Sequence, residues 1–121
     1  FDLREEKWKM QNRKGKKNAA QLLDPMVYSK IATTMLQKDY RDRMEGDTPE
    51  LYRLERMSRK MGVTRQTFYR YLSQDTAKPQ LDLFVRYAQA IDIMPSQFFW
   101  TLAGLFYQAE ETERNRDEKK E

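Results

Sequence analysis

The stretch Met61–Leu72, MGVTRQTFYRYL, decides the fold that we expect for this chain. Met61 closes a segment of apolar residues at helical spacing, and Gly62 can adopt the left-handed conformation that ends a helix. Thr64 follows almost at once, and its hydroxyl can cap the first amides of another helix. Two short helices joined through a turn that contains glycine are the pattern of a helix-turn-helix.

Working outward from this turn, capping residues and apolar spacing predict helices along most of the chain. Asp24 and Pro25 form an N-cap followed by proline at the first helical position, and Gly46 stops the helix that they start. A capping residue stands again before Pro49, and residues 74–79 are expected to form a loop. The expected helices span residues 25–44, 49–61, 65–73 and 80–92, and a fifth opens at Ser96.

Within these helices, apolar residues recur at spacings of three and four, which marks the faces expected to pack in a core. For the two helices of the turn, the expected inward residues are Met57, Met61, Val63, Phe68 and Tyr71, with Leu72 beside them. Ser58 is small where the two helices should cross. The fourth helix presents Leu81, Phe84, Ala88 and Ile91, flanked by Leu83 and Tyr87.

Composition supports a helical reading of the whole chain. The 121 residues suffice for one domain with one hydrophobic core. Apolar residues make up 39% and charged residues 35%, which favours short amphipathic helices with a well-hydrated surface. Gly and Pro are few, and helix-forming side chains outnumber β-branched ones. We therefore expect an all-α protein with a compact five-helix domain.

Charge divides the chain into three regions. Residues 1–23 are expected to form a largely flexible basic arm, with seven Lys or Arg against three acids. Residues 24–107 form the helical domain, with its helix-turn-helix at about 49–73. Residues 108–121 have no apolar pattern and are expected to be a charged C-terminal tail that frays. The basic residues of the arm are concentrated in Arg13, Lys14, Lys16 and Lys17.

The chain contains no Cys and no His, which removes disulfides, thiol nucleophiles, zinc sites of the usual kind and imidazole bases. The remaining side chains form no catalytic motif, so we do not expect an enzyme, a cofactor or a bound metal. The longest apolar run, Phe98–Tyr107, is too short to cross a membrane, and the charged start FDLREEKWKM is unlike a signal peptide. A soluble, cytoplasmic protein is therefore expected.

The second helix of the turn predicts contacts with double-stranded DNA. A recognition helix places its first residues at base edges in the major groove, where Gln pairs with adenine and Arg with guanine. The expected base-reading residues are Arg65, Gln66, Thr67, Tyr69 and Arg70. The expected phosphate-contacting residues are Arg59, Lys60, Thr64, Ser73 and Lys78. From Glu50 to Lys78, seven basic residues stand against three acids, which favours a polyanionic partner.

The segment SRKMGVTRQTFYRYLS, followed by KPQLDLFVRYAQAIDIMPSQFF, resembles the lambda-repressor and Cro-like family, often called XRE-type. The resemblance covers roughly residues 48–100. It implies a lambda-repressor-like five-helix domain, usually dimeric, and a frequent Gln near the start of the recognition helix, here Gln66. The chain departs from the family by its longer preceding helix, its basic arm, and Ser58 where Ala is common. We expect no ligand-binding or catalytic domain within these 121 residues.

The fifth helix is apolar on nearly every side, which suggests a homodimer interface formed by Phe99, Trp100, Leu105 and Phe106. The alternative is that the long first helix or the arm packs against these residues. The arm itself either follows DNA phosphates or enters the minor groove, or it is only a solubilising tail.

These features lead us to expect a sequence-specific DNA-binding protein that acts as a transcriptional regulator of the repressor type, at a phage, plasmid or bacterial promoter. Two alternatives remain. One is a DNA-binding accessory protein of plasmid transfer or replication, and the other is a helix-turn-helix adaptor that binds another protein.

Overall fold

The computed structural model describes residues 21–73 and 78–120, and in these ranges the chain forms only helices and their connections. The expected all-α fold class is confirmed there. Arg13, Lys14, Lys16 and Lys17 of the predicted arm lie outside the described residues. The elements are α2 (Pro25–Met44), the 3-10 helix η2 (Pro49–Tyr52), α3 (Leu54–Met61), α4 (Arg65–Ser73), α5 (Leu81–Ala90) and α6 (Pro95–Lys120).

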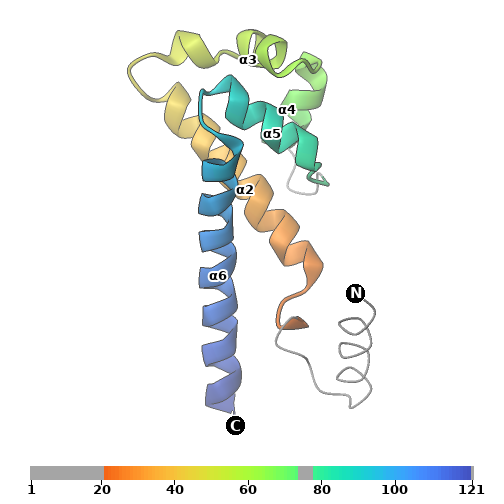
Figure 1. The fold of residues 1–121 in the computed structure, drawn as a ribbon, viewed down its shortest axis with the longest axis vertical. Helices are drawn as coiled ribbons and strands as arrows, with labels where there is room; N and C mark the ends of the chain where they lie inside the picture. Colours follow the sequence, from red (N-terminus) through yellow and green to blue (C-terminus); the bar gives the residue numbers. More distant parts are fainter. Residues whose placement is uncertain (1–20, 74–77, 121) are drawn as a thin grey trace.

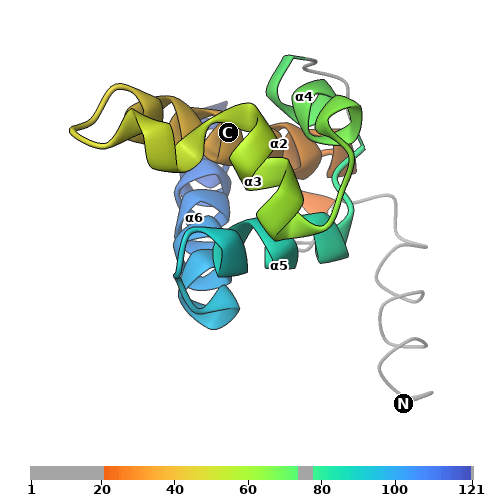
Figure 2. The same ribbon diagram turned by 90° about the horizontal axis from the view of Figure 1, so that it is seen from above.

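The helices α3, α4 and α5 gather at one end of the molecule, and α6 extends away from them as a long rod (Figure 1). The helix α2 links both parts, because it packs against α6 and also contacts η2 and α4. Viewed from above, α3 lies in front, with α4 and α5 beside it (Figure 2). The two helices of the predicted turn therefore lie at the end of the molecule opposite the C-terminus of α6.

The helix α2 has the predicted bounds, and its N-terminus has the predicted cap. The backbone N–H of Met26 donates to the Asp24 carboxylate at 2.8 Å, and Pro25 occupies the first turn. At the other end, the N–H of Glu45 donates to the Arg41 carbonyl. Gly46 follows in the connection to η2, where the sequence predicted the helix to stop.

The predicted second helix, 49–61, is wrong as a single element, because the chain is extended at Arg53, with φ −56° and ψ 145°. The first part is the 3-10 helix η2, and only Leu54–Met61 is α-helical. The Tyr40 hydroxyl of α2 donates to the Tyr52 carbonyl at 2.6 Å, which satisfies this carbonyl outside a continuous helix. As a consequence, Leu51 is exposed, although its spacing predicted a place on the apolar face.

The core forms where α2, α3, α4, α5 and the start of α6 meet. Its largest fully buried side chains include Phe68, Tyr87, Leu36, Met57 and Met61. The rings of Phe68 and Tyr40 meet edge to face, with centroids 5.3 Å apart, and Tyr87 in turn contacts Phe98. The predicted inward positions of the turn pair are thus confirmed for Met57, Met61, Phe68 and Tyr71, while Val63 and Leu72 are half-buried.

One predicted core position of the fourth helix is wrong. Leu81 is 70% exposed, whereas Leu83, Phe84, Tyr87, Ala88 and Ile91 are buried. Leu81 is the first residue of α5, so the apolar stripe that reaches the core begins only after it. The helix ends at Ala90, with Ile91 as its C-cap. Asp92 then takes the left-handed conformation, with φ 61°, and the N–H of Ile93 donates to the Ala88 carbonyl.

The predicted frayed tail is also corrected, because α6 continues without a break to Lys120. The residues after Tyr107 are mostly good helix formers, and ion pairs at helical spacing join Arg114 to Glu111 and Arg116 to Glu113. Near the start of this extension, the Tyr28 hydroxyl of α2 donates to Glu110 at 2.7 Å. This charged segment without apolar periodicity therefore forms a helix because it continues the apolar first part of α6, which has already nucleated the helix.

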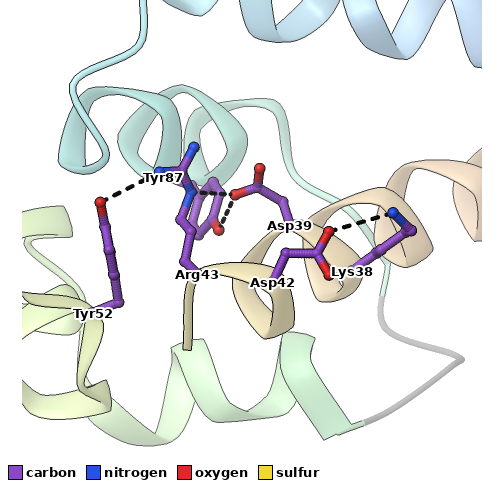
Figure 3. Close-up of polar contacts among 6 residues, drawn as sticks. All are labelled: Lys38, Asp39, Asp42, Arg43, Tyr52 and Tyr87. Carbon is purple, nitrogen blue, oxygen red and sulfur yellow. Dashed lines mark hydrogen bonds and ion pairs between the residues drawn. The ribbon is translucent and has the colours of Figure 1, made fainter. Parts of the chain in front are cut away.

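A polar cluster of the buried Tyr87 and the half-buried Asp39, Arg43 and Tyr52 connects α2 to α5 and η2 (Figure 3). The Tyr87 hydroxyl donates to Oδ2 of Asp39 at 2.5 Å, and Nε of Arg43 donates to the same oxygen at 2.8 Å. The Arg43 guanidinium also lies over the Tyr52 ring, 5.3 Å from its centroid. Burial, reinforced by the bond to Asp39, raises the pKa of the Tyr87 hydroxyl, which keeps this group protonated as a donor.

Replacing Tyr87 with Phe should lower the free energy of unfolding by about 1–2 kcal/mol, because the half-buried Asp39 carboxylate loses a donor. Urea denaturation followed by circular dichroism measures this change. The matched control is Tyr69→Phe, in which the altered residue is 57% exposed and little change in the free energy of unfolding is expected without DNA. Equal stability of Tyr87→Phe and the wild type would show that the cluster does not stabilise the fold.

Candidate nucleic-acid interface

The turn between α3 and α4 has the predicted geometry. Gly62 is left-handed, with φ 70°, and the N–H of Val63 donates to the Ser58 carbonyl at 3.0 Å. Thr64 then caps α4, because its hydroxyl oxygen accepts from the backbone N–H of Thr67 at 3.1 Å. Ser58 is buried beneath this junction. The turn is therefore closed by hydrogen bonds on both sides.

The helix α4 has two chemically different faces. Phe68 and Tyr71 point into the core, and the opposite side of the helix carries polar and aromatic side chains. Among the predicted base-reading residues, Arg65, Gln66, Tyr69 and Arg70 are exposed, and Thr67 is half-buried. Gln66 and Arg70 are four residues apart, so they form one line along the exposed face. Tyr69 beside them is 57% exposed.

Arg65 differs from the other exposed residues of α4 because it has a partner on α3. Its Nη1 lies 3.4 Å from Oε1 of Glu55, and both side chains are largely exposed. An ion pair of this kind is weak and is screened by salt. Arg65 therefore lies at the flank of the exposed face, directed toward α3, and this contact can be exchanged for another anion at small cost.

The predicted phosphate-contacting residues fall into two groups. The hydroxyls of Thr64 and Ser73 form hydrogen bonds with the backbone of α4. The Thr64 oxygen accepts from the N–H of Thr67, and the Ser73 hydroxyl donates to the Tyr69 carbonyl at 2.9 Å. The side chains of Arg59 and Lys78 are exposed, and so is Lys60, whose Nζ makes a long contact of 3.5 Å with the Ala90 carbonyl. The long basic side chains are thus better suited to an anionic partner than the hydroxyls.

Positive charge around α3 and α4 is directed outward. All seven basic residues predicted to favour an anionic partner are exposed: Arg53, Arg56, Arg59, Lys60, Arg65, Arg70 and Lys78. The described acids between Glu50 and Lys78 are Glu50 and Glu55, and Glu55 is the one paired with Arg65. The part of the chain described here therefore carries an excess of solvent-exposed positive charge.

Two side chains that support α4 were not singled out in the sequence. Gln37 of α2 donates from Nε2 to the Tyr71 carbonyl at 2.9 Å, and Arg86 of α5 donates from Nη1 to the Met61 carbonyl at 2.9 Å. Their helical spacing places each beside apolar residues, but no local pattern identifies a partner on another helix. Tyr71 extends the support, because its hydroxyl donates to the Lys78 carbonyl at 2.9 Å.

The four residues predicted to form a homodimer interface are not equally available. Trp100 is 81% exposed, whereas Phe99, Leu105 and Phe106 are half-buried. Phe106 packs edge to face against Tyr28 of α2, with ring centroids 4.9 Å apart. The long first helix therefore covers Phe106, which is the alternative to a dimer contact at this residue. The apolar stripe that stays open on α6 consists of Trp100, Ala103, Gly104 and Tyr107.

The chain matches no protein-family model, no curated protein and no solved structure. Within residues 21–73 and 78–120, no helix is long and apolar enough to cross a membrane. The same residues contain no group of three or more His, Cys, Asp or Glu side chains that could hold a metal ion. The chemistry of the exposed face of α4 is therefore the basis for assigning a function.

Replacing Gly62 with Ala should destabilise the protein by about 1–2 kcal/mol, because a side chain is strained at this left-handed φ. The new Cβ would also lie 2.9 Å from Nη1 of Arg86 and would displace it. Gly104→Ala is a control of opposite sign, since Gly104 lies inside α6 with nothing within 4 Å of an added Cβ. It should stabilise the protein by about 0.5–1 kcal/mol in the same urea titration. A neutral Gly62→Ala would contradict the role given to the turn.

Proposed function

We propose that this protein binds double-stranded DNA in a sequence-specific manner and regulates transcription, as a repressor-type regulator of a phage, plasmid or bacterial promoter. The observation that carries the proposal is the exposed face of α4, where Gln66, Tyr69 and Arg70 project from a helix whose other side is buried in the core. The resemblance of residues 48–100 to the lambda-repressor and Cro-like family supports the same function.

In the proposed complex, α4 lies in the major groove. Gln66 pairs with an adenine, and Arg70, or Arg65 after it leaves Glu55, pairs with a guanine. Thr67 and Tyr69 offer methyl and ring carbon atoms to thymine methyl groups. Arg59, Lys60 and Lys78 contact phosphates and add affinity that falls as salt concentration rises.

A homodimer would let two copies of α4 read two half-sites about 34 Å apart. The open stripe on α6 supports this arrangement, since the sequence carries no charged residue from Ile93 to Ala109, so pairing buries no charge from this segment. The exposed Trp100 ring also lines one side of a hollow, whose other lining residues are Met35, Asp39, Ile93, Ser96, Gln97, Phe98 and Thr101. A ring and a hollow on one surface can complement each other across a two-fold axis.

The same open stripe favours a second candidate, an adaptor that binds another protein through α6. A DNA-binding accessory protein of plasmid transfer or replication would use α4 in the proposed way but would not regulate a promoter. A measurement of sequence-specific DNA binding distinguishes the adaptor from the other two candidates. The regulator and the accessory protein both require a preferred DNA sequence, whereas the adaptor does not.

Selection of binding sites from random DNA duplexes should enrich a defined sequence. On that sequence, Gln66→Ala and Arg70→Ala should each reduce affinity about 5- to 150-fold, corresponding to about 1–3 kcal/mol per lost base contact. Affinity is measured by gel shift at fixed salt. Gln108→Ala, at an exposed position on α6, is the control and should bind like the wild type.

Two results would count against DNA recognition by α4. One is that no sequence is enriched. The other is that Gln66→Ala binds all duplexes more weakly by the same factor, because loss of a base contact should affect the selected sequence alone.

Trp100→Glu and Tyr107→Glu should each shift the protein from dimer to monomer, because a carboxylate would be buried without a partner in the α6 interface. Multi-angle light scattering measures the mass directly. Leu81→Glu is the matched control, since Leu81 is also an exposed apolar residue but lies on α5. A dimer that persists in Trp100→Glu, or a wild-type protein that is monomeric both free and on its DNA site, would rule out this interface.

A further inference from the structure

Arg86 connects α5 to the turn between α3 and α4. Its Nη1 donates to the carbonyl of Met61, the last residue of α3, at 2.9 Å. The same guanidinium group lies against Gly62, where an added Cβ would stand only 2.9 Å from Nη1. Its Nε lies 3.7 Å from Asp82, one turn earlier on α5. Arg86 thus spans from α5 to the turn, and its ion pair with Asp82, between two exposed side chains, is weak.

The carbonyl that Arg86 reaches is one that the helix cannot satisfy by itself. The last carbonyls of an α-helix have no intrahelical donor, and the turn amides here bond to earlier residues, with Gly62 bonding to Arg59 and Val63 to Ser58. A charged donor from α5 supplies the Met61 carbonyl with a strong hydrogen bond. The direction in which the chain leaves α3, and hence the direction of α4, depends in part on this bond.

We propose that Arg86 is a positioning residue for DNA recognition, which orients α4 for the major groove without touching DNA. This inference rests on the proposed function. The bond from Arg86 holds the N-terminal side of α4 through the turn, and Gln37 holds its C-terminal end through the Tyr71 carbonyl. A short helix fixed at both ends presents Gln66 and Arg70 in one orientation, and small errors in orientation weaken paired hydrogen bonds to bases.

A direct contact between Arg86 and a DNA phosphate is the competing role, because about half of its side chain is exposed. The two roles differ in their response to salt and sequence. Loss of a phosphate contact weakens binding to every duplex and lowers the salt dependence of affinity by about one counterion. Loss of a positioning bond weakens binding to the selected sequence and leaves binding to random duplexes, with its salt dependence, almost unchanged.

The test uses Arg86→Met, which removes the donor, and Arg86→Gln, which keeps a neutral donor. Arg86→Met should lose about tenfold in affinity for the selected duplex but not for random duplexes, and Arg86→Gln should recover part of this loss. Two controls accompany them. Asp82→Asn removes the ion pair on α5 but leaves the bond to Met61, and Arg41→Met removes an exposed positive charge on α2.

Three results on DNA would overturn the inference. An equal loss on selected and random duplexes with a smaller salt dependence would make Arg86 a phosphate contact. An equal loss with unchanged salt dependence would indicate only a smaller folded fraction. No loss at all would mean that the bond to Met61 does not affect recognition.

Amide hydrogen exchange tests the positioning role without DNA, which separates its failure from that of the proposed function. In Arg86→Met, the amides of Val63, Thr67 and Phe68, which bond across the turn and the first turn of α4, should exchange about tenfold faster. Amides in the middle of α6 should not change. Unchanged exchange at the turn would overturn the inference even if the wild type binds no DNA.

Discussion

Burial of Phe68 is the constraint on which the exposed face of α4 depends. Its ring is fully buried and lies between Tyr40 of α2 and Tyr87 of α5, with ring centroids 5.3 and 6.0 Å away. Burial of a side chain of this size is worth roughly 1.5–3 kcal/mol. Because a helix has 3.6 residues per turn, fixing Phe68 and Tyr71 inward leaves Gln66 and Arg70 outward. The apolar core therefore decides which polar side chains meet the solvent.

Apolar contact alone would not fix a helix of 9 residues, which is too short to be stable in isolation. Directional hydrogen bonds from neighbouring helices complete its support. Gln37 and Arg86 bond to carbonyls at the two ends of the region, and the Thr64 hydroxyl caps its first turn. Behind them, Asp39 joins Tyr87 to Arg43, so that α2 and α5 hold a fixed relation to each other. The exposed face of α4 that we propose to bind DNA is thus held in position by contacts with α2, α3 and α5.

Much of this architecture could be predicted from local signals. The bounds of α2 follow from a cap at Asp24, and the turn follows from Gly62 and Thr64, since each acts on amides or dihedral angles within a few residues. The errors arose where another helix intervenes. The Tyr40 bond to Tyr52 accompanies the break in the expected helix 49–61, and the expected tail after Tyr107 continues as part of α6, which α2 contacts at Phe106 and Glu110. The lambda-repressor-like topology, the DNA partner and the dimer stay predictions.

The sequence by itself determined the all-α class, the position of the turn and the residues of α4 that face the core, because apolar periodicity and capping are local properties of the chain. Only the tertiary structure decided that Arg65 is directed toward Glu55, that Phe106 is covered by Tyr28 while Trp100 stays open, and that Arg86 reaches Met61. These contacts join residues from different helices. Their distances depend on how whole helices pack, and no spacing within one segment encodes that packing.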